Sequence, residues 1–88
     1  MHLKYTFETT ELEGQVVAVP VGEGADTYHG VIKLNETAAF IFGLLDKDTS
    51  IEAIIDCLED KYEVSRETLE KDVRKYISEF DKRGLLVK

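Results

Sequence analysis

The fold is decided within residues 30–45, which read GVIKLNETAAFIFGLL. Ile32 and Leu34 are separated by one residue, which is the period-two spacing of a strand that buries one face. Asn35 follows at once and is a favoured N-cap residue, so a helix over residues 36–45 is expected directly after the strand. The sequence therefore predicts a short strand that passes into a helix, with Ile32 and Leu34 pointing toward a common core.

Two further strands are expected before this junction. Residues 4–10 alternate between apolar and polar types, and residues 15–21 are rich in β-branched side chains, with Pro20 indicating an edge or a bend. We expect these two segments to form a hairpin. The glycine-rich residues 22–26 are expected to form a turn, after which a third strand extends over residues 28–34.

Two more helices are expected after the first, and each has a start signal in the sequence. Thr49 and the glutamate three residues later form a capping box, which predicts a helix that ends near residue 62. Ser65 is the N-cap candidate of a third helix over residues 66–83, and Gly84 is its left-handed terminator. Both helices carry an apolar stripe at helical spacing, so each is expected to pack one face against the core.

The predicted order of elements is three strands followed by three helices (β-β-β-α-α-α). A sheet packed on one side by helices belongs to the α+β class, and a chain of 88 residues is expected to form one domain, residues 1–88. The two consecutive helices joined at residues 63–65 have the form of a helix-turn-helix. We therefore expect a winged-helix-like domain with a three-stranded antiparallel sheet.

Composition argues against several function classes. The formal net charge of -7 disfavours unspecific binding to nucleic acid, because that binding needs clustered basic residues. No apolar run approaches the roughly 18 residues of a membrane span, and the first residues lack the apolar core of a signal peptide. The single Cys57 gives neither an internal disulfide nor a metal-ligand spacing, which fits a reducing compartment. We expect a cytoplasmic protein.

The sequence also lacks the side-chain sets that catalysis needs. His2 and His29 are isolated histidines without a second ligand at metal-binding spacing, so we expect no metal, no cofactor and no enzymatic activity. Lys61 lies four residues after Cys57, which leaves an activated thiolate as an alternative.

Two features point to binding. Residues 66–83 hold six basic and five acidic residues, a net charge of +1, whereas residues 1–65 hold four basic and thirteen acidic residues, a net charge of -9. The third helix is therefore an electropositive ridge on an acidic domain, although the solvated face of an amphipathic helix shows the same pattern. The third strand is expected at a sheet edge, where unpaired backbone groups accept a partner strand or are too few to need protection.

Residues 30–45 are also where the sequence resembles the coenzyme PQQ synthesis protein D family. The resemblance continues through TSIEAI at residues 49–54, YEV at residues 62–64, Asp72-Val73 and FDKRGLL at residues 80–86. It covers essentially the whole chain. It implies a peptide-recognition element that holds the leader of a ribosomally made, post-translationally modified peptide and delivers it to a modifying enzyme, often a radical SAM enzyme.

The resemblance further implies where the peptide lies. In the family, the leader adds as a strand beside the third strand and lies against the third helix. Carried over by position, the backbone groups that would pair with the leader are those of Val31, Ile32 and Lys33. The residues that would line or border the groove are Asp72, Val73, Arg74, Lys75 and Tyr76.

Two other interpretations stay open. A winged-helix regulator would bind DNA through the basic residues of the third helix, against the acidic charge of the whole chain. A scaffold module would form a homodimer by pairing the edge strands of two copies. Neither a nucleic acid nor a membrane partner is expected under the peptide-binding interpretation.

Overall fold

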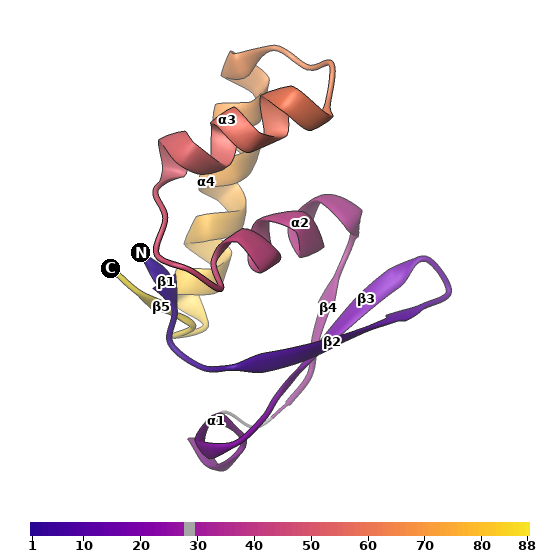
Figure 1. Ribbon diagram of the computed structural model, residues 1–88, viewed down its shortest axis with the longest axis vertical. Helices are drawn as coiled ribbons and strands as arrows, with labels where there is room; N and C mark the ends of the chain where they lie inside the picture. The colour runs from indigo at the N-terminus through magenta and orange to yellow at the C-terminus, as the bar shows by residue number, and fades with distance from the viewer. Residues whose placement is uncertain (28–29) are drawn as a thin grey trace.

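The computed structural model describes residues 1–27 and 30–88, in which the three longer helices pack on one side of a three-stranded sheet (Figure 1). In chain order the elements are β1 (His2–Leu3), β2 (Phe7–Leu12), β3 (Gln15–Pro20), α1 (Glu23–Thr27), β4 (Ile32–Leu34), α2 (Glu36–Leu44), α3 (Ile51–Lys61), α4 (Arg66–Lys82) and β5 (Leu86–Val87). The predicted α+β class is confirmed. Tyr28 and His29, the first two residues of the predicted third strand, lie outside the described residues.

β2, β3 and β4 form the sheet in that order, and both pairs are antiparallel. The β2–β3 hairpin turns at Glu13 and Gly14, whose positive φ angles of 50° and 80° suit a two-residue turn of type I′. Pairing therefore continues to Leu12, directly before the turn. The strand predicted over residues 4–10 is wrong at both ends, because its first residues connect β1 to β2 and its last residue lies inside β2.

In the described part of the chain, β4 is an edge strand, because it pairs with β3 on one side only. The paired residues are Val16 with Leu34, Val17 with Lys33 and Ala18 with Ile32. Ile32 and Leu34 are buried whereas Lys33 is exposed, which confirms the predicted alternation. Asn35 alone separates β4 from α2.

A two-stranded ribbon that the sequence analysis missed joins the two ends of the described chain. His2 of β1 lies opposite Val87 of β5, and Leu3 lies opposite Leu86. The backbone N–H of Lys4 extends this contact by donating to the carbonyl of Leu85 at 2.7 Å. Strands of two residues are too short to show a period, so this long-range pairing leaves no pattern in the sequence.

The predicted starts of α2 and α4 and the predicted terminator Gly84 are confirmed, although α4 ends at Lys82, one residue before its predicted end. The side chain of Asn35 accepts a hydrogen bond from the N–H of Ala38 at 2.8 Å, and that of Ser65 accepts one from the N–H of Thr68 at 3.3 Å. Gly84 follows α4 with a φ of 72°, the left-handed conformation of a helix terminator.

The predicted N-cap of α3 at Thr49 is wrong by one residue. Ser50 caps the helix, and its hydroxyl accepts a hydrogen bond from the N–H of Ala53 at 3.1 Å. The backbone of Thr49 is bound to the N-terminal segment instead, with its N–H donating to the carbonyl of Met1 at 2.8 Å. A tertiary contact therefore decides which of two adjacent hydroxyl residues begins the helix.

The turn predicted over residues 22–26 is also wrong, because this segment contains the short helix α1. A Cβ atom added at Gly24 would lie only 3.0 Å from the Cβ of Tyr5. Glycine thus lets the helical turn pack directly against the segment between β1 and β2, a contact that local turn propensities do not reveal.

The core lies between the inner face of the sheet and the three longer helices. Two T-shaped aromatic contacts join its layers: Phe7 of β2 and Phe42 of α2 have ring centroids 5.1 Å apart, and Phe42 and Phe80 of α4 have centroids 5.5 Å apart. No polar or charged residue is fully buried among those whose burial is described. In the described part of the chain, no helix is long and apolar enough to cross a membrane.

Candidate functional site

A groove of about 190 Å³ lies between the edge strand β4 and the second half of α4. We call it the β4–α4 groove. Its floor consists of buried apolar residues, and its rim carries the polar and charged side chains. The residues that line it are Ile32, Lys33, Leu34, Asn35, Ala38, Tyr76, Glu79, Phe80 and Arg83.

A hydrogen bond across the groove joins its two walls. The side-chain amide of Asn35 donates to the hydroxyl of Tyr76 at 3.0 Å. The amide oxygen of Asn35 also accepts the capping hydrogen bond from Ala38, so one side chain both starts α2 and contacts α4. This bond fixes one end of the groove, at the junction of β4 and α2.

The rim of the groove carries charges that have no ion-pair partner among the described residues. Among the ion pairs of the described residues, none includes Lys33, Glu79 or Arg83. Some charges elsewhere on α4 are paired, as where Arg74 contacts Glu70 at 3.2 Å. Glu79 and Arg83 on the groove wall, and Lys33 on the outer side of β4, are therefore available to a ligand.

The structure brings together three of the residues predicted for the site. Ile32, Lys33 and Tyr76 all line the β4–α4 groove. Val31 precedes β4 and is 55% exposed, so it lies beside the edge without belonging to the strand. Val73 is 0% exposed and belongs to the core.

The other three predicted residues lie on α4 outside the groove lining. Asp72 is exposed one turn before Tyr76, and Lys75 is exposed on the outer surface of the helix. Arg74 lies about 160° around the helix from Tyr76, at about 100° per residue, where it pairs with Glu70.

Glu79 and Arg83 are groove residues that the sequence-based site did not include. They follow Tyr76 at three and seven residues, a spacing that places all three on one side of a helix. This spacing was available in the sequence. The sequence does not show, however, which border of the apolar stripe of α4 faces β4.

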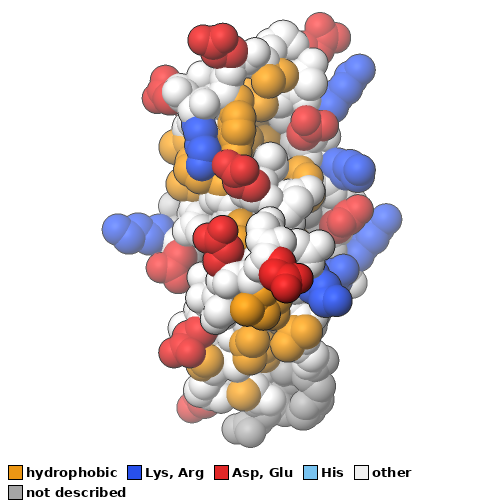
Figure 2. Space-filling view, turned by 90° about the vertical axis from the view of Figure 1, so that its right-hand side faces the viewer, with side chains coloured by type: hydrophobic (Ala, Val, Ile, Leu, Met, Phe, Trp, Pro, Cys, Tyr) orange, Lys and Arg blue, Asp and Glu red, His pale blue; other side chains and the backbone are white. Residues whose placement is uncertain are grey.

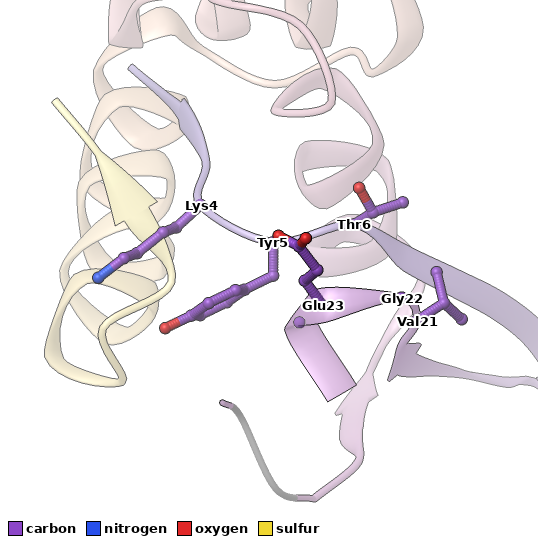
Figure 3. Close-up of a pocket in the computed structure, with 7 residues that line it drawn as sticks. Lys4, Tyr5, Thr6, Val21, Gly22 and Glu23 are labelled. Atoms are coloured by element: carbon purple, nitrogen blue, oxygen red, sulfur yellow. The ribbon is translucent and has the colours of Figure 1, made fainter. Parts of the chain in front are cut away.

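A second hollow, of about 540 Å³, lies beside α1 (Figure 3). Its walls come from the segment between β1 and β2 and from the residues that lead into α1; Lys4 and Tyr5 face it from the first of these. The N–H of Val21 already donates to the carbonyl of Thr6 at 3.0 Å, which joins the two walls. Its two walls are thus joined by a backbone hydrogen bond, whereas the outer edge of β4 has no strand partner among the residues that the structure describes.

The described residues show no arrangement suited to metal binding. They contain no group of three or more His, Cys, Asp or Glu side chains that could hold a metal ion. Cys57 is exposed on α3. Two pKa values are displaced by surface contacts outside the groove: the hydrogen bond from the Met1 ammonium group lowers the pKa of Asp48, and the hydrogen bond to Asp56 raises the pKa of Arg66.

Fold and site together define a small α+β domain in which an open strand edge lies beside an amphipathic helix. The family of coenzyme PQQ synthesis protein D matches residues 10–86, and the chain belongs to this family. No curated protein matches the chain.

Two solved structures share the fold. TbiB1 in complex with the TbiA(β) leader peptide has a TM-score of 0.73 and 23% identity, covering 98% of this chain and 94% of that one. A lasso peptide synthetase B1 complexed with the leader peptide has a TM-score of 0.70 and 22% identity, covering 99% of this chain and 96% of that one. At these identities the likeness establishes the fold.

Proposed function

We propose that this protein is a non-enzymatic adaptor that binds the leader segment of a ribosomally made precursor peptide and presents it to a modifying enzyme, of the radical SAM class. The observation that carries the proposal is the open edge of β4 beside the β4–α4 groove. Membership of the coenzyme PQQ synthesis protein D family and the leader-bound fold neighbours support it.

An extended leader would bind by adding a fourth strand to the sheet. Backbone groups on the outer edge of β4 would hydrogen-bond to the peptide, and alternate peptide side chains would enter the groove. The apolar floor formed by buried residues such as Ala38 and Phe80 suits an apolar side chain, while the charged rim acts on its neighbours.

β4 is better suited than β2, the other edge of the sheet, to accept this strand. β2 carries Glu8 and Glu11, and Glu11 lies opposite the partly buried Val16, on the side of the sheet that faces the helices. A charge on the inner side of an edge strand is a known protection against strand pairing. β4 has only Lys33, which is on the outer side.

The proposal is tested by titrating isotope-labelled protein with the leader of the precursor encoded beside it and following backbone amide shifts. We expect the largest shifts in β4 and along Tyr76, Glu79 and Arg83. Peptides methylated on one backbone nitrogen at a time should lose affinity at every second position, since only alternate N–H groups of an added strand face β4. Shifts confined to other surfaces, or losses without this period, would refute strand addition.

The role of the partner enzyme needs a separate measurement. Modification of the full precursor by the radical SAM enzyme should slow markedly when the adaptor is omitted and recover when it is added. A precursor without its leader should be unaffected by the adaptor. Equal rates with and without the adaptor would refute the presentation role.

The ion pairs of α4 argue against the alternative that this helix binds DNA. Arg66, one of the basic residues it would use, contacts Asp56 at 2.9 Å and also Glu59, and Arg74 contacts Glu70. Figure 2 shows Asp and Glu side chains spread over the viewed face, with most Lys and Arg side chains along one margin. Paired cations release fewer counterions from a phosphate backbone, so their contribution to DNA binding falls.

We also propose a cytoplasmic location, in keeping with the single free Cys57.

A further inference from the structure

Two opposite charges stand one helical turn apart on the α4 wall of the β4–α4 groove. Glu79 and Arg83 both line the groove, at the spacing at which a glutamate and a following basic residue commonly pair. No ion pair of the described residues joins them or involves either one. Each charge is therefore free to act on a ligand in the groove.

The spacing of these charges matches that of an extended peptide. Alternate residues of a strand lie about 6.6 Å apart on one face, and side chains four residues apart on a helix have Cβ atoms about 5–6 Å apart. Two successive groove-facing side chains of a bound strand can thus reach Glu79 and Arg83 together. The residue between them points away from the groove.

The direction of the bound strand decides which charge comes first. β4 runs from α1 toward α2, whereas α4 runs in the opposite direction, from α3 toward β5 (Figure 1). Both existing pairs of the sheet are antiparallel. A strand that continues this pattern beside β4 therefore runs in the same direction as α4, so it meets Glu79 before Arg83.

We propose that the groove selects a leader strand with a basic residue followed two positions later by an acidic residue, read by Glu79 and Arg83. This inference rests on the proposed leader-binding function. The charge order fixes the register of the strand, because a shift by one residue would turn both charges away from the groove.

The test compares two short synthetic peptides that differ only in charge order, Lys-x-Glu or Glu-x-Lys, within the same alternating apolar frame. The wild-type protein is expected to bind the Lys-x-Glu peptide about fivefold to tenfold more tightly at low ionic strength, because two attractive contacts replace two repulsive ones. The ratio should shrink in about 0.5 M salt, where screening is stronger.

The variant Glu79→Arg with Arg83→Glu exchanges the two charges and keeps the net charge, so its preference should reverse. The matched control is Glu70→Arg with Arg74→Glu, which exchanges an ion pair on another face of the same helix and should keep the wild-type preference. A folded exchange variant with an unchanged preference, or equal binding of both peptides by the wild type, would overturn the charge-order inference alone. Binding of neither peptide up to about 1 mM, together with no binding of the leader, would overturn the proposed function as well.

Discussion

Replacing Ala38 with leucine is expected to fill the β4–α4 groove and weaken leader binding. Ala38 lies in the first turn of α2, is 4% exposed and lines the groove of about 190 Å³. An isobutyl group at this position would occupy the space that a groove-facing side chain of the peptide takes. The substitution therefore tests whether the groove itself contributes to binding.

The magnitude follows from the apolar contact that is lost. Full burial of one large apolar side chain contributes about 1.5–3 kcal/mol, which corresponds to roughly a tenfold to hundredfold change in Kd. The substitution is expected to lower the free energy of unfolding by less than it weakens leader binding, because the groove gives the leucine room. Without that room, overpacking would cost about 1–3 kcal/mol.

Fluorescence anisotropy with a labelled leader measures the affinity, and urea unfolding measures the stability. Ala39→Leu is the matched control, because it makes the same change at the next position of α2, which lines a different hollow with Glu11, Gly14 and Val16. We expect this control to bind the leader normally. The reasoning is refuted if folded Ala38→Leu binds as tightly as the wild type, or if both variants weaken equally.

Three further predictions concern the groove wall and the helix ends. Asn35→Ala is expected to lower the free energy of unfolding by about 1 kcal/mol, because the helix cap is lost. A double-mutant cycle with Tyr76→Phe should isolate a coupling of about 0.5–1 kcal/mol for the hydrogen bond between the two side chains. A coupling near zero in urea unfolding would contradict that bond. Gly84→Ala should destabilise the protein by about 1 kcal/mol, because the φ of Gly84 is 72°. Gly43→Ala inside α2 should instead stabilise the protein by up to about 1 kcal/mol. Shifts of the melting temperature with the same sign in both variants would refute this contrast. Arg66→Ala should lower the midpoint of urea unfolding only slightly, because its ion pairs are exposed. A large decrease of that midpoint would contradict this prediction.

The sequence by itself determined the features of this protein that depend on neighbouring residues. Ile32 and Leu34 are buried as their alternation predicts, and Asn35 and Ser65 begin helices through hydrogen bonds to residues three positions later. Gly84 ends α4 in the left-handed conformation that glycine favours. Such features follow from backbone geometry and side-chain chemistry within one or two turns, so the α+β class and the edge strand beside a helix could be predicted.

The tertiary structure alone decided how these elements meet. Thr49 and Ser50 are both suitable caps, and only the contact of Thr49 with the N-terminal segment leaves Ser50 to begin α3. A helical wheel identifies the apolar stripe of α4, but either border of that stripe could face β4. Packing placed Tyr76 and Arg83 on the groove and turned Arg74 away, because the rotation of a helix about its axis is set by the side chains of every element it contacts at once.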